Sequence, residues 1–390
     1  MKRVAIPFAL LLFFAGCSAN EGWTPSPDEP RAFVTTLGAD TVAVEVYTVT
    51  DRTIEGILVE RTPYTHIIEY VADLDANGHI ASLSFTKRTP DANPAGPVAQ
   101  NVSTRVMDGT ATITTEGGDN AGTVVVDSVG MAIPMLGRNA VAMFEFEHVA
   151  SMLHNGAQDI MILGPTGSAP RGNAAMVLSA DTVSMDYFGS PRKGWTDGKG
   201  QLLGVSGAVT TNKSESRRVQ PFLVGEMAER WAAMDTAGKG IGTPSPGAVV
   251  AMSLDGANVE VNYSQPAKRG RAIWGQLVPE GQVWRTGANA ATHFSTSSNL
   301  DIAGNELPAG TYTLWSIYEN GALRLIVNSQ TNQWGTLHDP ALDLFSAEMT
   351  KSELGEMAER FTISIEDTDE GGTIHFDWDM NRFSLPFSVK

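Results

Sequence analysis

The sequence predicts a mainly β protein: an N-terminal antiparallel curved sheet or half-barrel with one or two helices, followed by a C-terminal antiparallel β-sandwich. Two observations predict this class. Short segments rich in alternating β-branched residues recur along both halves of the chain. Turn-forming pairs separate several of them, namely Asn77-Gly78, Asn320-Gly321 and Gly371-Gly372.

Length and charge limit the possibilities further. The chain has 390 residues, which fits two domains better than one. Its 27 Lys and Arg residues stand against 44 Asp and Glu residues, giving a formal net charge of -17. Such a surface repels phosphate backbones, so no nucleic-acid partner is expected.

The N-terminus resembles a lipoprotein signal. Lys2 and Arg3 precede an apolar run, Val4 to Phe14, that is too short to span a bilayer. The run ends at Cys17, the single cysteine of the chain, in a sequence that looks like a lipobox. We therefore expect residues 1–17 to be a signal peptide and Cys17 to become an acylated N-terminus, with diacylglycerol and palmitate as its membrane anchor. The alternative is an ordinary signal peptide with a chance cysteine.

The segment after Cys17 indicates a location. Ser18 rather than Asp follows the anchor, which favours the outer membrane, facing the periplasm, in an enterobacterium-like sorting system. Residues 18–32 are rich in Pro, Ser and acidic residues and are expected to form an extended tether.

The N-terminal domain is expected at residues 33–237. Apolar residues at helical spacing predict helices near 141–153 and 222–234 within it. Strands are expected at 41–49, 66–74, 80–85, 111–115, 123–127, 176–187 and 202–209. The Gly- and Pro-rich stretch 238–247 is the clearest linker.

The C-terminal domain, residues 248–390, again has strand patterns. We expect strands at 249–254, 258–263, 292–297, 311–318, 322–328, 362–366, 373–378 and 383–389. The octad 225–232 nearly repeats at 355–362. The similarity stops outside the octad, so we interpret it as a coincidence rather than a structural repeat.

This domain carries the most specific motifs of the chain. They are Gly270-Arg271, Leu277-Val278-Pro279-Glu280-Gly281, Val283-Trp284-Arg285-Thr286-Gly287-Ala288-Asn289, Leu307-Pro308-Ala309-Gly310-Thr311-Tyr312-Thr313-Leu314, Asn328 and Gln333-Trp334-Gly335. In this order they resemble the bacterial domain-of-unknown-function family 2911, from about residue 248 to 390. One departure is Gln265, where the family often has Arg. The resemblance implies a fold and a compartment, not an activity.

Candidate ligand-binding residues cluster in the same stretch. They are Arg269, Arg271, Trp274, Trp284, Arg285, Asn289 and His293. Arginine forks and an amide suit an anionic or sugar-like ligand, on which a tryptophan could stack. The structural alternative is that the arginines bind strand-end carbonyls and the tryptophans fill the core. The sequence favours the structural alternative slightly.

No motif for catalysis or metal binding is complete. Asp73 to Ile80 matches the first eight positions of a calcium loop, but Ser84 stands where a bidentate Glu is needed, so a hairpin is favoured. The histidine spacings support no zinc site. Gly204 to Ala208 fails the nucleophile-elbow pattern at its last position. We therefore assign no catalytic residue, metal or cofactor, although a site assembled from distant strands stays open.

Together these observations favour a non-enzymatic, lipid-anchored envelope protein that binds an unknown small molecule or envelope protein. A structural or assembly lipoprotein is the second interpretation, in which the Arg–Trp–Asn motif only stabilises the fold. An envelope hydrolase with an inter-domain site is the third.

Overall fold

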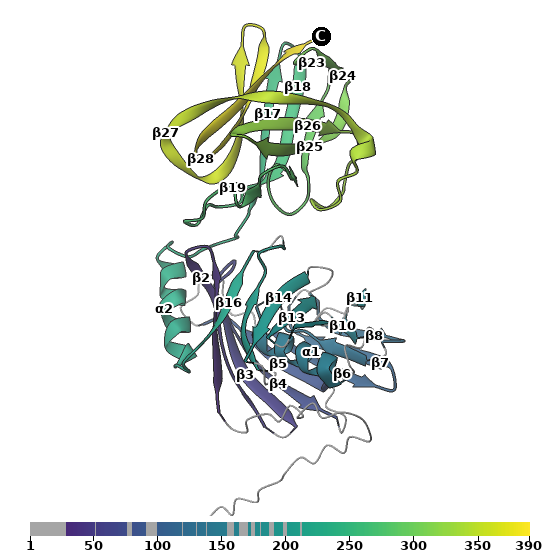
Figure 1. The fold of residues 1–390 in the computed structure, drawn as a ribbon, viewed down its shortest axis with the longest axis vertical. Coiled ribbons are helices and arrows are strands. Elements are labelled where there is room, and N and C mark those ends of the chain that lie inside the picture. The colour runs from purple at the N-terminus through teal and green to yellow at the C-terminus, as the bar shows by residue number, and fades with distance from the viewer. Residues whose placement is uncertain are drawn as a thin grey trace, which may run out of the picture. The chain divides into compact units, whose positions relative to one another are not determined.

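A computed structural model describes residues 29–390 except 51, 76–79, 91–99, 119, 130, 138, 154–159, 164–170, 173–175, 180, 187–190, 198–200 and 211–212 (Figure 1). The chain divides into two compact units, Met1–Gly242 and Thr243–Lys390. The division falls inside the stretch 238–247. Cys17, the signal segment and the Asn77-Gly78 turn lie outside the described residues.

Unit 1 is built around one large antiparallel sheet. Its strands are β1 (Arg31–Leu37), β2 (Asp40–Val49), β3 (Thr53–Glu60), β4 (His66–Leu74), β5 (Ile80–Arg88), β6 (Gln100–Met107), β7 (Thr110–Glu116), β8 (Gly122–Val126), β12 (Met176–Ser179), β13 (Thr182–Asp186), β14 (Pro191–Thr196), β15 (Leu202–Ser206) and β16 (Glu215–Val219). These 13 strands follow the order β12-β13-β14-β15-β16-β1-β2-β3-β4-β5-β6-β7-β8. A smaller sheet joins β9 (Met131–Pro134), β10 (Ile160–Leu163) and β11 (Arg171–Gly172).

The curved antiparallel sheet predicted for this half is confirmed, and it does not close into a barrel. The segment 176–187 is two strands, β12 and β13, joined by a turn, where the sequence pattern indicated one. β1 begins at Arg31, inside the segment 18–32, because Arg31 and Ala32 are buried against β2.

Two helices cover opposite faces of this sheet (Figure 1). Helix α1 (Val141–Leu153) has the predicted bounds, and its apolar residues from Val141 to Phe146 pack into the main core. Helix α2 (Val224–Thr236) begins and ends two residues later than predicted. It buries Val224, Ala228 and Trp231 on Val44 and other residues of the opposite face. The two helices contact different side chains of the same strands, because successive side chains along a strand point to opposite faces of the sheet.

A buried polar cluster holds α1 to the sheet. The Glu45 carboxylate in β2 accepts hydrogen bonds from the backbone amides of Val141 and Ala142, at 2.6 and 3.1 Å, and from the Tyr70 hydroxyl at 2.7 Å. It thus satisfies amides at the helix N-terminus, which have no partner within the helix. Glu145 of α1 forms an ion pair with Arg31, and both side chains are fully buried.

Unit 2 is built from a second antiparallel sheet. Its strands are β17 (Gly247–Leu254), β18 (Ala257–Ser264), β21 (Val283–Trp284), β22 (Thr292–Thr296), β23 (Leu300–Ile302), β24 (Asn305–Leu307), β25 (Gly310–Glu319), β26 (Ala322–Asn328), β27 (Asp343–Thr368) and β28 (Gly371–Val389). Two short strands, β19 (Trp274–Gly275) and β20 (Val278–Pro279), pair in parallel, and η1 (Pro340–Leu342) is a 3₁₀ turn.

This second sheet folds around a large apolar core, and a smaller apolar cluster contains Ala291, Trp315 and Ile326. Its curvature brings Tyr263 of β18 to Ile363 of β27, where the Tyr263 hydroxyl accepts a hydrogen bond from the Ile363 amide at 2.9 Å. The Asn320-Gly321 turn is confirmed, with the positive φ values, 53° and 84°, that a type I′ turn needs. The other hairpin turns at residues 369–370, so Gly371 and Gly372 begin β28 instead.

Candidate functional site

The two tryptophans of the motif stretch are part of the apolar core of unit 2. Trp284 stacks on Trp378 with ring centroids 5.8 Å apart, and Trp274 meets Trp284 edge-on at 6.2 Å. The Trp284 indole donates to the Gly287 carbonyl at 3.0 Å. Both rings therefore stabilise the fold, and neither forms an open stacking platform.

Arg271 is engaged by its own loop. Its Nε donates to the Lys268 carbonyl at 2.9 Å and its Nη2 to the Ala267 carbonyl at 2.6 Å. The neighbouring Arg269 has a left-handed backbone, with φ 50°, and its amide donates to the Glu359 carboxylate at 2.8 Å. The Arg269 amide fastens the loop to β27, whereas the two Arg271 bonds close the loop on itself.

The loop from Arg285 to Asn289 has an unusual backbone. Thr286 and Asn289 have φ values of 51° and 60°, and Gly287 has 152°. A left-handed conformation is costly for a β-branched residue such as Thr286, so the surroundings must fix it. They do so through Thr292, whose hydroxyl donates to the Thr286 carbonyl at 2.6 Å, and through a 2.7 Å bond between the Thr286 and Ser316 hydroxyls.

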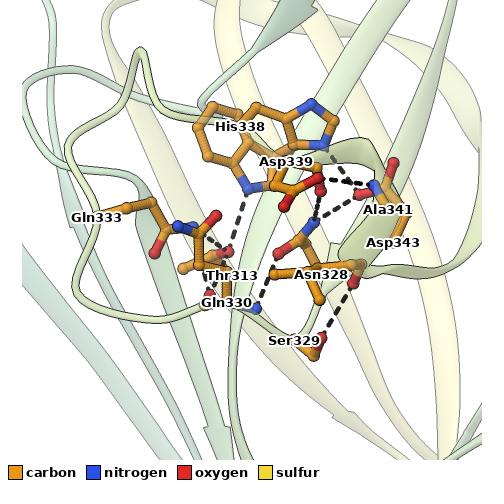
Figure 2. Close-up of polar contacts among 11 residues, drawn as sticks. Thr313, Asn328, Ser329, Gln330, Gln333, His338, Asp339, Ala341 and Asp343 are labelled. Carbon is orange, nitrogen blue, oxygen red and sulfur yellow. Dashed lines mark hydrogen bonds and ion pairs between the residues drawn. The ribbon is translucent and has the colours of Figure 1, made fainter.

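A segment that we call the strap, residues 329–342, crosses next to this loop and is held by a polar network (Figure 2). At one end the Thr313 hydroxyl donates to the Gln330 carbonyl and accepts from the Gln333 amide, both at 2.9 Å. At the other end Asp343 Oδ1 is 2.8 Å from His338 Nε2 and accepts from Asn328 at 2.7 Å. The Thr313 and His338 contacts join the strap to β25 and β27, and the Asn328 contact joins β26 to β27 at the end of the strap, so its path is fixed.

The strap meets the loop at Gly335. The Arg285 Nη1 donates to the Gly335 carbonyl at 3.2 Å, and the Gly335 amide donates to the Asn289 carbonyl at 3.1 Å. A Cβ atom at residue 335 would overlap the Arg285 side chain. The glycine of Gln333-Trp334-Gly335 therefore lets the arginine cross the strap.

His293 and Asn289 join the same assembly. His293 Nε2 accepts from the Asn332 amide at 2.9 Å, so its Nδ1, 2.9 Å from the Ala291 carbonyl, carries the proton. Asn289 donates to the Ser245 carbonyl at 3.2 Å and to the Ser264 hydroxyl at 3.3 Å. Of the sequence-predicted residues, the structure brings Arg285, Asn289 and His293 together at the strap and places Arg269 and Arg271 in another loop.

Arg285 differs electrostatically from these neighbours. Burial lowers the pKa of its guanidinium from 12.5 to about 10. Within residues 213–390, all of which the structure describes, no carboxylate forms an ion pair with it. Its Nε is buried without a partner, and its Nη2 makes no hydrogen bond. A half-buried cation with one neutral carbonyl as its partner is suited to receive an anion.

Two exposed apolar side chains lie on the strap, close in sequence to Gly335. Trp334, adjacent to Gly335, is 48% exposed, and Leu337 is 60% exposed. Trp334 belongs to the motif Gln333-Trp334-Gly335. Its exposure could not be predicted, because the sequence alone does not distinguish a surface tryptophan from a core tryptophan. Among the described residues no group of three or more His, Cys, Asp or Glu could hold a metal ion.

The motifs that contain Arg271, Arg285 and Gly335 all lie in a region that matches a known protein family. Residues 245–387 match the family described as "Protein of unknown function (DUF2911)". The resemblance inferred from the sequence is thereby confirmed for the C-terminal region. Within the matched region, the motif that contains Arg285 and the motif that contains Gly335 supply the contacts that join the loop to the strap.

Other comparisons add little. No curated protein matches the chain. Among solved structures, it is similar to a DUF1089 family protein from Pseudomonas aeruginosa, with 11% identity over 43% of this chain and 90% of that one and a TM-score of 0.29. It is also similar to a putative AttH from Nitrosomonas europaea, with 10% identity over 92% of each chain and a TM-score of 0.11. Scores this low support no argument about fold or function.

Proposed function

We propose that this chain is an exported, lipid-anchored binding protein of the cell envelope, whose DUF2911 region binds an anionic group at Arg285. The observation that carries the binding proposal is the enclosed Arg285 guanidinium without a counter-ion. A charge removed from water is normally paired, because an unpaired one loses its hydration without compensation. An external carboxylate or phosphate would supply that pair.

Exposed apolar residues beside the cation indicate the rest of the ligand. Trp334 and Leu337 would contact an apolar or aromatic group attached to the anion. A carboxylate on an aromatic ring therefore fits better than a bare inorganic anion. The contacts of Arg285, Asn289 and His293 described above do not include a nucleophile and base at hydrogen-bond distance, so binding is the function that we propose for this site.

The anchor part of the proposal rests on the N-terminal sequence. Lys2 and Arg3, the apolar run and the single Cys17 together suit export and acylation. No helix among the described residues is long and apolar enough to cross a membrane. Labelling cells with a palmitate analogue should mark the wild-type chain but not Cys17→Ala, and labelling that persists in the variant would refute acylation at this residue.

Binding at Arg285 can be tested with the full-length protein in detergent. We expect benzoate to quench tryptophan fluorescence with saturation, and acetate and inorganic phosphate to bind more weakly. Arg285→Gln should weaken benzoate binding at least tenfold, about 1.4 kcal/mol or more. Arg271→Gln is the matched control, since two donors of Arg271 are taken by backbone carbonyls, and it should bind benzoate normally.

A specific observation also favours the structural alternative. Arg271 donates to two carbonyls of its own loop, and the tryptophans lie in the core. If Arg285→Gln lowers the melting temperature while none of the three anions binds either protein, the motif only stabilises the fold.

A further inference from the structure

A second concave surface lies in unit 1, on the sheet face that α2 partly covers. We call it the sheet trough. Its volume is about 830 Å³, within the range of small-molecule sites. Outward-facing side chains of six adjacent strands line it, namely Val46, Thr48, Glu55, Ile57, Glu69, Val71, Ser84, Thr86, Asn101, Ser103, Thr114 and Glu116.

The face can be assigned from strand alternation. Tyr47, Tyr70 and Phe85 belong to the main core on the α1 side, so the residues next to them point away from that core. Val46 and Ile57 pack in the cluster that contains α2. Helix α2 therefore bounds one end of the sheet trough, and the trough continues across β4 to β7, where no described helix covers it.

The strand register orders the lining side chains into two neighbouring rows. In one row Ile57 is paired with Glu69, Glu69 with Thr86, Thr86 with Asn101 and Asn101 with Glu116. The other row runs from Glu55 through Val71, Ser84 and Ser103 to Thr114 by the same pairings. Aliphatic residues thus lie near α2, and hydroxyl and amide groups follow on β5 to β7.

The chemistry of these groups selects among ligands. Ser84, Ser103 and Thr114 can each donate and accept a hydrogen bond, and Glu55 and Glu116 accept. Among the described residues, Arg88 forms an ion pair with the lining residue Glu69 at 3.2 Å. Carboxylates repel an anion, so the ligand proposed for Arg285 does not suit the sheet trough.

We propose that the sheet trough binds a neutral saccharide. Adjacent hydroxyl groups on a sugar present donors and acceptors side by side, which matches a surface of hydroxyl, amide and carboxylate groups. The C–H face of a sugar ring contacts the aliphatic surface of Ile57 and Val71, the latter 42% exposed. This site is independent of Arg285, because its residues belong to unit 1.

The test uses the full-length protein in detergent and isothermal titration with maltotriose, cellotriose and chitotriose. Ser103→Tyr fills the hydroxyl-rich part of the sheet trough. We expect it to weaken saccharide binding at least tenfold, because the ring occupies the ligand's place. Thr112→Tyr is the matched control, since Thr112 is exposed on the same face of the neighbouring strand but does not line the trough. It should bind like the wild type.

Titration with spermidine distinguishes a saccharide-binding site from a site for a cationic ligand. Binding of spermidine without any saccharide, equal saccharide binding by both tyrosine variants, or no saccharide binding at all would each overturn the proposal. Arg285→Gln should leave saccharide binding unchanged. The sheet trough and the Arg285 site can therefore fail separately, since benzoate reports one and the trisaccharides the other.

Discussion

Arg31 is fully buried in unit 1 and Arg285 is half-buried in unit 2, and their surroundings differ. Arg31 is paired with Glu145 in a cluster whose other members, Glu45, Tyr47 and Tyr70, are also buried. Arg285 has one neutral carbonyl partner. Arg31 has a counter-charge within the protein, although its Nη2 is buried without a hydrogen-bond partner, whereas Arg285 has no counter-charge. Burial of a charged side chain therefore does not by itself indicate a binding site, whereas burial without a counter-charge does.

The largest effect is expected from breaking the complete pair. Glu145→Gln leaves Arg31 buried without a counter-charge, which should lower the free energy of unfolding of unit 1 by about 3–5 kcal/mol. Urea unfolding followed by circular dichroism measures this change. Adding Arg31→Met to Glu145→Gln should recover much of the loss. A loss below about 1 kcal/mol in the single variant would show that the pair contributes no more than a surface ion pair.

The same cluster predicts a pH dependence. Burial raises the pKa of Glu45 from 4.5 to about 7, so the folded protein holds a proton that the unfolded chain releases. The contribution to stability is complete below about pH 4.5 and is lost as the pH rises through 7. It amounts to about 3 kcal/mol. Urea midpoints of unit 1 from pH 4.5 to 8 should show this decline, and Glu45→Gln should reduce it. An unchanged slope in Glu45→Gln would assign the pH dependence to other groups.

In unit 2, Gly335→Ala should separate the strap from the loop. The added methyl overlaps the Arg285 side chain and approaches the Asn289 carbonyl, so one of them must move. We expect a loss of about 1–3 kcal/mol, typical of an overpacked position, with weaker benzoate binding. Gly355→Ala is the control, because a Cβ at residue 355 would meet open space. Gly304→Ala would be unsuitable, since the φ of 80° at Gly304 would strain an alanine. Gly355→Ala should leave both stability and binding unchanged.

The smallest effect should come from removing the uncompensated charge. Arg285→Met deletes one hydrogen bond and the desolvation cost of the guanidinium, so stability without ligand should change by less than about 1 kcal/mol in either direction. Thermal unfolding measures this, with Glu145→Gln as the contrast. A loss as large as that of Glu145→Gln would mean that Arg285 is a structural pair member after all.

The sequence predicted the β architecture and the bounds of α1, because hydrophobic periodicity is a local property. The hexapeptide Gly-Glu-Met-Ala-Glu-Arg shows where local information ends, since it occurs at residues 225–230 in α2 and at 355–360 in β27. In α2 its alanine lies between Val224 and Trp231 on one buried helical face. In β27 the following residues Phe361 and Ile363 alternate into the core. Flanking residues and tertiary packing therefore decide the structure, and interpreting the near repeat as a coincidence is confirmed.

The site itself was only partly accessible to sequence reasoning. The motif contained Arg285 and Asn289, but their contact with Gly335 joins residues 50 positions apart, and no local pattern reports it. The first part of β27 was missed for a related reason. Glu348, Lys351 and Glu353 are exposed there, and after Phe345 only the modestly hydrophobic Ala347 and Met349 face the core before residue 354, so the strand has little hydrophobic signal.

The length of β27 and β28 has a consequence for protein engineering. The two strands, of 26 and 19 residues, run through the whole of unit 2 and share one short turn. Opening the backbone at residues 369–370 would separate the two longest strands, whereas opening it at Asn320-Gly321 would interrupt one ordinary hairpin. Circular permutants with new termini at these two places should therefore differ in yield, and the second is the better place to insert a reporter domain.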